Sequence, residues 1–386
     1  MDFSYLTVLP RGRQLWDYVV MPPEEYDARK AKIDKIFDKT GLDGLIVYSD
    51  AMSRRYINYL TNYTCSVAWS CAIMIVTRER LLRLVSSVAP RDINYNLKTL
   101  APNIELNGIG LSLLTNYRVA HKTIEYLKSH NMSEMRWGGV NIDSLCYEGQ
   151  KPIYEAYPDL PDCTPLYDEV LMQKTGAEQF AIAQAATIAK KAVLDYLRMA
   201  VPGANEREVA ARVDRQCRVY GVGNIALLVS ARKDGKLCLR QPEDYIIQEG
   251  DTVSAHVDIN YLNYHGMFAS SLYRGKPSDE RNVFYKTVEE DYNKLLESIK
   301  SKKSIGGISF HNSSGYALAQ GIGGDTTEAP YKDNDTPLEN GTVFTLTLCR
   351  DDRQFGGVII SDTFKIDESG IHQLGGPGLD KLNFYA

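Results

Sequence analysis

This chain of 386 residues lacks several features that would assign a protein to a class at once. It has no run of five or more basic residues and a net charge of −5, so we expect no nucleic-acid partner. Its longest apolar stretches, such as 67–76, are too short to span a membrane. The first residues lack the basic head and apolar body of a signal peptide. These absences predict a protein without a membrane partner.

Two kinds of motif are also missing. None of the seven cysteines forms a C-x-x-C pair, which argues against a zinc site and for reduced thiols in a cytoplasmic protein. The glycine-rich stretch 321–324 matches neither phosphate-binding fingerprint. The sequence therefore predicts no metal and no nucleotide cofactor.

The first half of the chain alternates helical and strand patterns. Helical patterns are expected at 22–41, 51–58 and 114–130, strands at 44–49, 67–76, 81–86, 104–106 and 137–142, and a further element at 91–100. Such alternation is typical of an α/β layer structure. Three prolines, Pro158, Pro161 and Pro165, with polar residues between them, indicate a linker. We therefore predict an N-terminal domain at 1–165 and a C-terminal domain at 166–386.

The second half has a different order of elements. Thr175 and Glu178 have the spacing of a capping box, which predicts a helix that ends near Met199, and Asn205 with Glu208 opens a second helix. Strands are expected at 225–230 and 252–274, a helix at 279–302, and strands at 342–350 and 358–366. This order favours an α+β domain with an antiparallel sheet covered by helices.

The stretch 252–275 is the part on which the functional argument depends. It predicts a hairpin of two buried strands, in which apolar residues alternate with Ser254, His256, Asp258 and Asn260. His256 and Asp258 are therefore expected on the same face. Two titratable side chains there indicate either a lined pocket or a plain surface.

The C-terminal half resembles the pita-bread fold of the creatinase, methionine aminopeptidase and prolidase superfamily. The resemblance rests on ordered motifs: LMQKTGAE, Gly250-Asp251, AQGIGGDTTEAP at 319–330, NGTVFTLTL at 340–348 and VIISDTFKI at 358–366. The N-terminal half, with INYLTNY at 57–63, looks like the smaller domain of the creatinase and prolidase branch. The resemblance implies an α+β pita-bread catalytic-type domain preceded by a smaller α/β domain.

Peptidases of this superfamily bind two metal ions with two Asp, one His and two Glu residues. The resemblance places these five positions at His256, Met267, Gln320, Thr347 and Ser361, none of which is a carboxylate. A neutral set of this kind does not balance two dications. Two substrate-side histidines of the family correspond to Leu239 and Thr327, so a histidine base inherited in place is absent as well.

The same resemblance gathers the candidate site residues around one cavity. His256 is the candidate general base, with a structural histidine as the alternative, and Glu328 is a catalytic acid/base or the anchor of a loop. Arg240 and Arg350 could clamp a carboxylate or form surface ion pairs. The other candidate substrate-binding residues are Asp258, Tyr264, Gln320, Thr327, Thr347 and Ser361.

These residues lead to a functional expectation. We expect a metal-independent enzyme that acts on a small polar or zwitterionic metabolite, by hydrolysis, elimination or cyclisation at a C–N bond, and not a metallopeptidase. The alternative is an inactive pseudo-peptidase that binds a peptide, protein or metabolite. The resemblance further implies a homodimer, since two-domain members of the superfamily usually pair.

Overall fold

The structure is a computed structural model that describes residues 20–376, apart from 23, 62, 64, 66–69, 80, 88–104, 111–114, 234–235 and 334. The element expected at 91–100, the start of the expected strand 67–76 and most of the N-terminal arm lie outside the described residues. The chain forms two compact units, Met1–Leu171 and Met172–Ala386. The predicted domain boundary near 165 stays a prediction, and helix α6 (Thr164–Met172) crosses that position.

The first unit has three layers. Its five-stranded sheet has the order β4-β3-β2-β1-β5, in which β3–β4 and β1–β5 pair in parallel and the other strands pair antiparallel. The strands are β1 (Gly44–Asp50), β2 (Cys71–Thr77), β3 (Leu81–Ser86), β4 (Glu105–Gly108) and β5 (Trp137–Val140). The helices are α1 (Glu24–Thr40), α2 (Arg55–Thr61), α4 (Thr115–Ser129), α5 (Tyr147–Ala156) and α6, with a 3₁₀ turn η1 (Ile142–Ser144).

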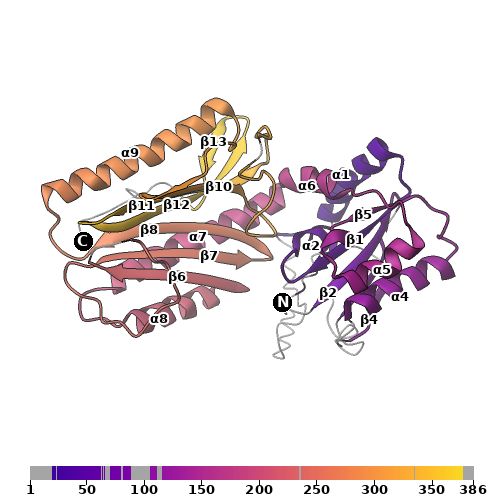
Figure 1. Ribbon diagram of the computed structural model, residues 1–386, viewed down its shortest axis with the longest axis horizontal. Helices are drawn as coiled ribbons and strands as arrows, with labels where there is room; N and C mark the ends of the chain where they lie inside the picture. Colours follow the sequence, from indigo (N-terminus) through magenta and orange to yellow (C-terminus); the bar gives the residue numbers. More distant parts are fainter. Residues whose placement is uncertain are drawn as a thin grey trace. The chain divides into compact units, whose positions relative to one another are not determined.

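Alternation along β1 explains why helices cover both faces of this sheet. Leu45 and Val47 pack in one core with α1, α2 and α6, whereas Ile46 and Tyr48 pack in another with α4 and α5. Figure 1 shows the two helix layers on either side of the sheet. The expected α/β layer structure is confirmed.

The second unit is built on an eight-stranded sheet of the order β6-β7-β8-β12-β11-β10-β9, with β13 paired to β12. The strands are β6 (Asn224–Arg232), β7 (Thr252–Tyr261), β8 (Tyr264–Tyr273), β9 (Phe310–Asn312), β10 (Gly315–Gly321), β11 (Val343–Asp352), β12 (Gly356–Asp367) and β13 (Gly370–Gln373). The helices are α7 (Gly176–Met199), α8 (Glu206–Val219) and α9 (Asp279–Lys302). The strands pair antiparallel, as expected for the α+β class.

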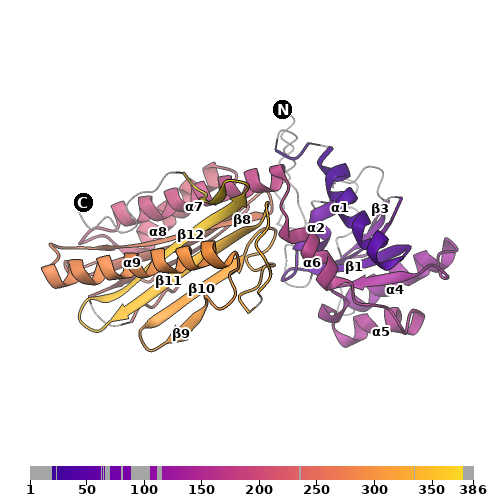
Figure 2. The same cartoon turned by 90° about the horizontal axis from the view of Figure 1, so that it is seen from above.

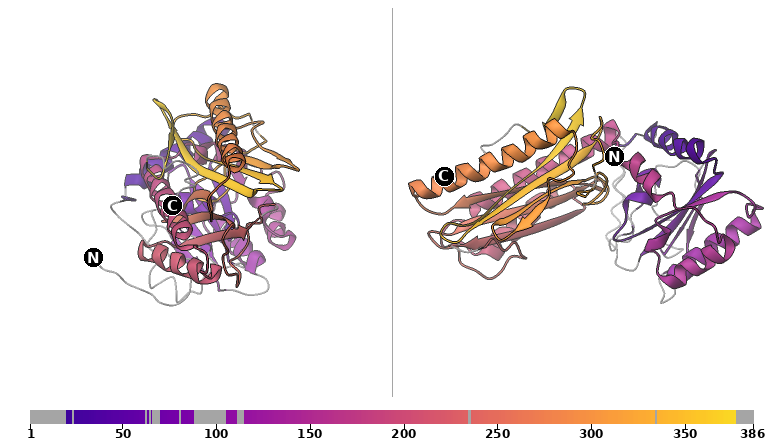
Figure 3. Two further views of the ribbon diagram at one scale, coloured as in Figure 1. Left: turned by 90° about the vertical axis from the view of Figure 1, so that its left-hand side faces the viewer. Right: turned by 45° about the horizontal axis from the view of Figure 1, so that its top comes forward.

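All three helices cover the same face of this sheet. Val257 and Phe268 pack in a core with α7 and α8, and Leu346 and Ile360 pack in a core with α9. The register joins these two groups on one side of the sheet, because Ser361 pairs with Ala269 and alternate residues share a face. Figure 2 and Figure 3 show the long helices α7 and α9 running along the strands.

Local sequence signals explain where these helices begin. Thr175 and Glu178 form the predicted capping box at the start of α7, and the Asn205 side chain accepts from the Arg207 and Glu208 amides at the start of α8. Ser278 caps α9 in the same manner. Within the described part of the chain, every helix is too short or too polar to cross a membrane.

Candidate functional site

The side of the second sheet that faces away from α7, α8 and α9 carries mostly polar residues, and we call it the polar face. It consists of Ser254, His256, Asp258 and Asn260 on β7, His265, Met267, Ala269 and Ser271 on β8, Ser361 and Thr363 on β12, Thr345 and Thr347 on β11, and Gln320 on β10. These residues share a face because they occupy alternate positions of strands in register.

Two rows cross the strands of the polar face. One runs His256–Ala269–Ser361–Thr347, and the other runs from Asp258 through Met267 and Thr345 to Gln320. Neighbouring strands lie about 4.8 Å apart, so His256 and Ser361 are roughly 10 Å apart along the sheet. The five positions that sequence analysis linked to metal binding therefore all lie on the polar face, with Gln320 at its far end.

The His256 ring is half-buried and lies in the middle of its strand. No described residue forms a hydrogen bond or an ion pair with this ring. Burial lowers the pKa of His256 below 6.5, and the nearby Asp258 carboxylate opposes this only in part. The imidazole is therefore neutral at pH 7 and can both accept and donate a hydrogen bond.

A second histidine on this face is tied to Asp258. His265 Nδ1 lies 3.0 Å from both carboxylate oxygens of Asp258, and its Nε2 lies 2.8 Å from the Asn260 side-chain nitrogen. The His265 amide also donates to the Gly323 carbonyl at 2.8 Å, which anchors the loop after β10. His265 was not among the predicted site residues. Its place on the polar face follows only from the hairpin register, in which it pairs with Asn260.

Hydroxyl groups connect the strands of the polar face. The Thr347 and Ser361 oxygens lie 2.7 Å apart, as do those of Ser254 and Ser271. Thr363 was not predicted; its hydroxyl accepts from the Met267 amide at 3.0 Å and donates to the Met267 carbonyl at 2.9 Å. The result is a network of mostly buried, uncharged hydrogen-bonding groups.

Three of the predicted binding residues lie elsewhere. Tyr264 points to the helix side, where its hydroxyl donates to Glu178 on α7 at 3.1 Å. Arg240 is paired with the buried Glu206 at 3.1 Å, and Arg350 with Asp291 on α9 at 3.0 Å. These contacts favour structural roles, in agreement with the ion-pair alternative for both arginines.

The two predicted residues of the loop after β10 differ from each other. The Thr327 side chain is exposed. Glu328 is buried, pairs with the ammonium group of Lys174 and accepts from the Asp325 amide at 2.8 Å. Because both carboxylate oxygens are engaged, the contacts of Glu328 favour the loop-anchor alternative over the acid/base role.

Cys349 lies two residues after Thr347 on β11 and therefore on the same side of the sheet. Its thiol is buried, and burial raises its pKa to about 12. A thiol of this kind is protonated at pH 7 and therefore a poor nucleophile. Cys349 is therefore a buried, inert cysteine.

The class of protein follows from the fold and from comparison with known proteins. Residues 181–368 match metallopeptidase family M24. The structure aligns with a prolidase from Pyrococcus horikoshii at a TM-score of 0.68 and 19% identity, over 92% of this chain and 99% of that one. An X-Pro aminopeptidase from Thermotoga maritima aligns at 0.71 and 20% identity, over the same shares of the two chains. The chain has the pita-bread fold of the creatinase and prolidase superfamily.

Two curated relatives have the same name, Xaa-Pro dipeptidase. Xaa-Pro dipeptidases from Pyrococcus horikoshii and Pyrococcus furiosus are 26% and 27% identical over 216 residues. The aligned part covers 52% of this chain and 62% of each relative. The predicted superfamily and fold class are therefore confirmed.

The same matches correct the functional expectation. We expected a metal-independent hydrolase or lyase for a small metabolite, and not a metallopeptidase. Both expectations are wrong, because the family is a metallopeptidase family and the curated relatives are dipeptidases. The expectation placed the missing charge of five side chains above the resemblance of the remaining chain to peptidases.

The polar face lacks the donor groups that a pair of metal ions needs. The five family positions offer an imidazole, a thioether, an amide and two hydroxyls, without a carboxylate. Among the residues that the structure describes, no three His, Cys, Asp or Glu side chains gather in a group that could hold a metal ion. Two dications need several anionic oxygens, so these residues do not fit the group.

Proposed function

We propose that this chain recognises short peptides, with Xaa-Pro dipeptides as the first class to test. The match of residues 181–368 to a metallopeptidase family and the similarity to Xaa-Pro dipeptidases support peptides as the ligand class. The single observation that carries the proposal is the polar face, on which His256, Gln320, Thr347 and Ser361 present hydrogen-bonding groups.

The chemistry of the polar face suits a peptide group. A peptide presents one N–H donor and one carbonyl acceptor per residue, and a mostly buried site must satisfy both. His256, Gln320, Thr347 and Ser361 each carry a group that can donate or accept. In the proposed complex, His256 and Gln320 contact the ligand, because they are the half-buried members of this set.

Calorimetric titration of the purified chain with Ala-Pro and Gly-Pro tests the proposal, with Pro-Ala as the reversed sequence. We expect saturable binding of the Xaa-Pro dipeptides. His256→Ala and Gln320→Ala should each weaken it by about tenfold, since loss of one good hydrogen bond costs roughly 1–2 kcal/mol.

Tyr264→Phe is the matched control, because this hydroxyl lies on the helix side of the same sheet. Its affinity should equal that of the unchanged chain. Proline release, measured in the same samples with and without added Mn²⁺ or Co²⁺, reports hydrolysis independently of binding. Absence of binding and of release for every dipeptide would refute the proposal.

We also propose that the chain is a homodimer, as the sequence resemblance implied. Light scattering after gel filtration should give twice the chain mass of 43.3 kDa, and a single-chain mass would refute this. A cytoplasmic location is supported by the seven cysteines, all of which are free thiols. Fractionation of expressing cells would check it.

A further inference from the structure

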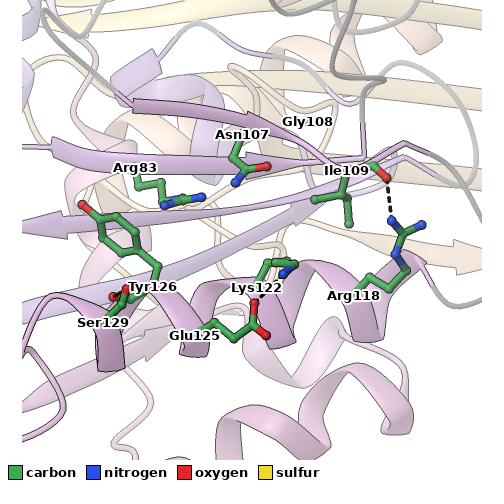
Figure 4. Close-up of a pocket in the computed structure, with 9 residues that line it drawn as sticks. All are labelled: Arg83, Asn107, Gly108, Ile109, Arg118, Lys122, Glu125, Tyr126 and Ser129. Atoms are coloured by element: carbon green, nitrogen blue, oxygen red, sulfur yellow. Dashed lines mark hydrogen bonds and ion pairs between the residues drawn. The ribbon is translucent and has the colours of Figure 1, made fainter.

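The first unit holds a cavity that indicates no ligand class. Its volume is about 550 Å³, and residues of α4, β3 and β4 line it (Figure 4). Cations of its lining are engaged within the protein: Arg118 donates to the Ile109 carbonyl at 2.9 Å, and Lys122 pairs with Glu125 at 2.5 Å. The sheet of the second unit is more informative, because its register places side chains directly beside the proposed peptide site.

Four mostly apolar residues lie together on the polar-face side of β10, β11 and β12. The register places Cys349 between Tyr316 and Ile359, and Leu318 follows Tyr316 two residues further along β10. The strand neighbours of these residues pack in the core beneath α9, so the four side chains point to the opposite side of the sheet. We call them the apolar patch: Tyr316, Leu318, Cys349 and Ile359.

Part of the apolar patch is accessible to a ligand. Ile359 and Cys349 are buried, with 0% and 2% exposure, whereas Tyr316 and Leu318 are half-buried. Leu318 pairs across the strands with Thr347, one of the hydrogen-bonding residues of the polar face. The patch therefore borders the groups that we propose to bind a peptide.

The Gln320 side chain indicates which part of a dipeptide lies beside the patch. Its Nε2 donates to the Thr326 carbonyl at 2.8 Å, which leaves its Oε1 as an acceptor for a ligand. The only N–H donor of an Xaa-Pro dipeptide is the amino group of Xaa, because the proline nitrogen carries no hydrogen. Leu318 lies two residues before Gln320 on the same face, roughly 7 Å away. An amino group bound at Gln320 therefore brings the Xaa side chain next to Leu318.

We propose, on the basis of the proposed peptide function, that the apolar patch binds the Xaa side chain, so that the polar face selects Xaa-Pro dipeptides with a large apolar Xaa. Burial of each additional carbon against the patch is favourable. Leucine at Xaa should therefore bind about tenfold more tightly than alanine.

The opposite end of the same row offers no comparable surface. Leu228 on β6 pairs with His256, and its neighbours on this face along the strand are Ala226 and Ser230. A single leucine among polar and small residues buries little of an apolar side chain. The location of the patch thus predicts selectivity at β10 and not at β6.

Calorimetric titration of the full chain with Leu-Pro, Ala-Pro and Asn-Pro tests the inference without any variant. The Kd of Leu-Pro should be about tenfold below that of Ala-Pro. Asn-Pro, which is close to Leu-Pro in size, should gain nothing over Ala-Pro. Leu318→Asn replaces the half-buried apolar side chain with a polar one of similar size, and it should bring the ratio of the Ala-Pro Kd to the Leu-Pro Kd close to one.

Leu228→Asn is the matched control, because Leu228 is also a half-buried leucine on this face. This variant should keep the Kd ratio of the unchanged chain. Equal affinity for Leu-Pro and Ala-Pro, equally tight binding of Asn-Pro, or the same loss of the ratio in Leu228→Asn as in Leu318→Asn would overturn the inference and leave the proposed function standing. Absence of binding for all three dipeptides would overturn both.

Discussion

At the scale of single residues, His256 has an environment that differs from that of the other histidine on its face. His265 is held by Asp258 and Asn260, whereas burial acts on His256 without a described hydrogen-bond partner. Sequence alternation was enough to place His256 and Asp258 on one face. It could not reveal that Asp258 turns to His265, because this contact depends on the pairing of two strands.

His256 gives a prediction about stability and pH. Burial lowers its pKa in the folded chain below the value of about 6.5 in the unfolded chain. The unfolded state therefore binds the proton more readily than the folded state. The contribution of neutral His256 to the stability of the folded chain is present above pH 6.5 and is lost as pH falls towards the folded pKa. The slope from one such group is at most about 1.4 kcal/mol per pH unit.

Denaturant unfolding at pH 8, 7, 6 and 5 measures this effect. The difference in unfolding free energy between the unchanged chain and His256→Gln should be constant from pH 8 to 7. Below pH 6.5 the unfolding free energy of the unchanged chain should fall relative to that of His256→Gln. A difference that stays constant down to pH 5 would show that His256 is not desolvated.

At the scale of elements, the hairpin β7–β8 shows what sequence patterns could and could not predict. The strands of 252–274 were predicted from alternation and turned out to be β7 and β8. The turn is Leu262-Asn263, two residues with positive φ of 50° and 67°, so Tyr261 pairs with Tyr264. This register places Tyr264 on the helix side. Without a clear turn signal such as Asn-Gly the register was open, and one step of register moves every side chain to the other face.

Other elements differ in how readily they could be predicted. Helix α9 was predicted with both its bounds, and the structure shows that Ser278 caps its start. Strands β9 and β13 are three and four residues long and carry no periodic signal, so they were missed. Helix α5 was also missed. It contains Pro152, and proline is unfavourable inside a helix.

The contact between β8 and α7 yields a prediction about two glycines. A Cβ on Gly266 would lie 2.3 Å from the Ala186 amide nitrogen, and backbone cannot move aside as a side-chain end could. Gly266→Ala should therefore lower the unfolding free energy by about 2 kcal/mol or more. Gly176 at the start of α7 has no atom within 4 Å of the corresponding position, so Gly176→Ala should be neutral or stabilise by up to about 1 kcal/mol.

Urea denaturation of both variants beside the unchanged chain gives the comparison. Equal effects of the two substitutions would contradict the close approach of β8 and α7. Far-UV circular dichroism of each variant confirms that the folded state is retained before the free energies are compared.

At the scale of the whole molecule, the hydrophobic cores follow the division into two units. Two buried clusters consist of residues before Met172 and two of residues after it. The prolines at 158–165 and the change in the order of elements indicated such a division, but the units divide after Leu171, within helix α6 (Thr164–Met172), which was not predicted. We infer that each unit can lose stability by itself, because each has its own buried apolar surface.

A pair of core truncations tests this inference by hydrogen exchange. Leu346→Ala removes a side chain of 0% exposure from the core beneath α9, and Leu45→Ala removes one of 0% exposure from the first unit. Each should cost about 2–5 kcal/mol. Leu346→Ala should speed exchange in the strands and helices after Met172 and leave β1 and β5 unchanged, and Leu45→Ala should do the reverse. Faster exchange throughout the chain in either variant would mean that the two units unfold as one, and the boundary would then separate two cores of a single cooperative domain.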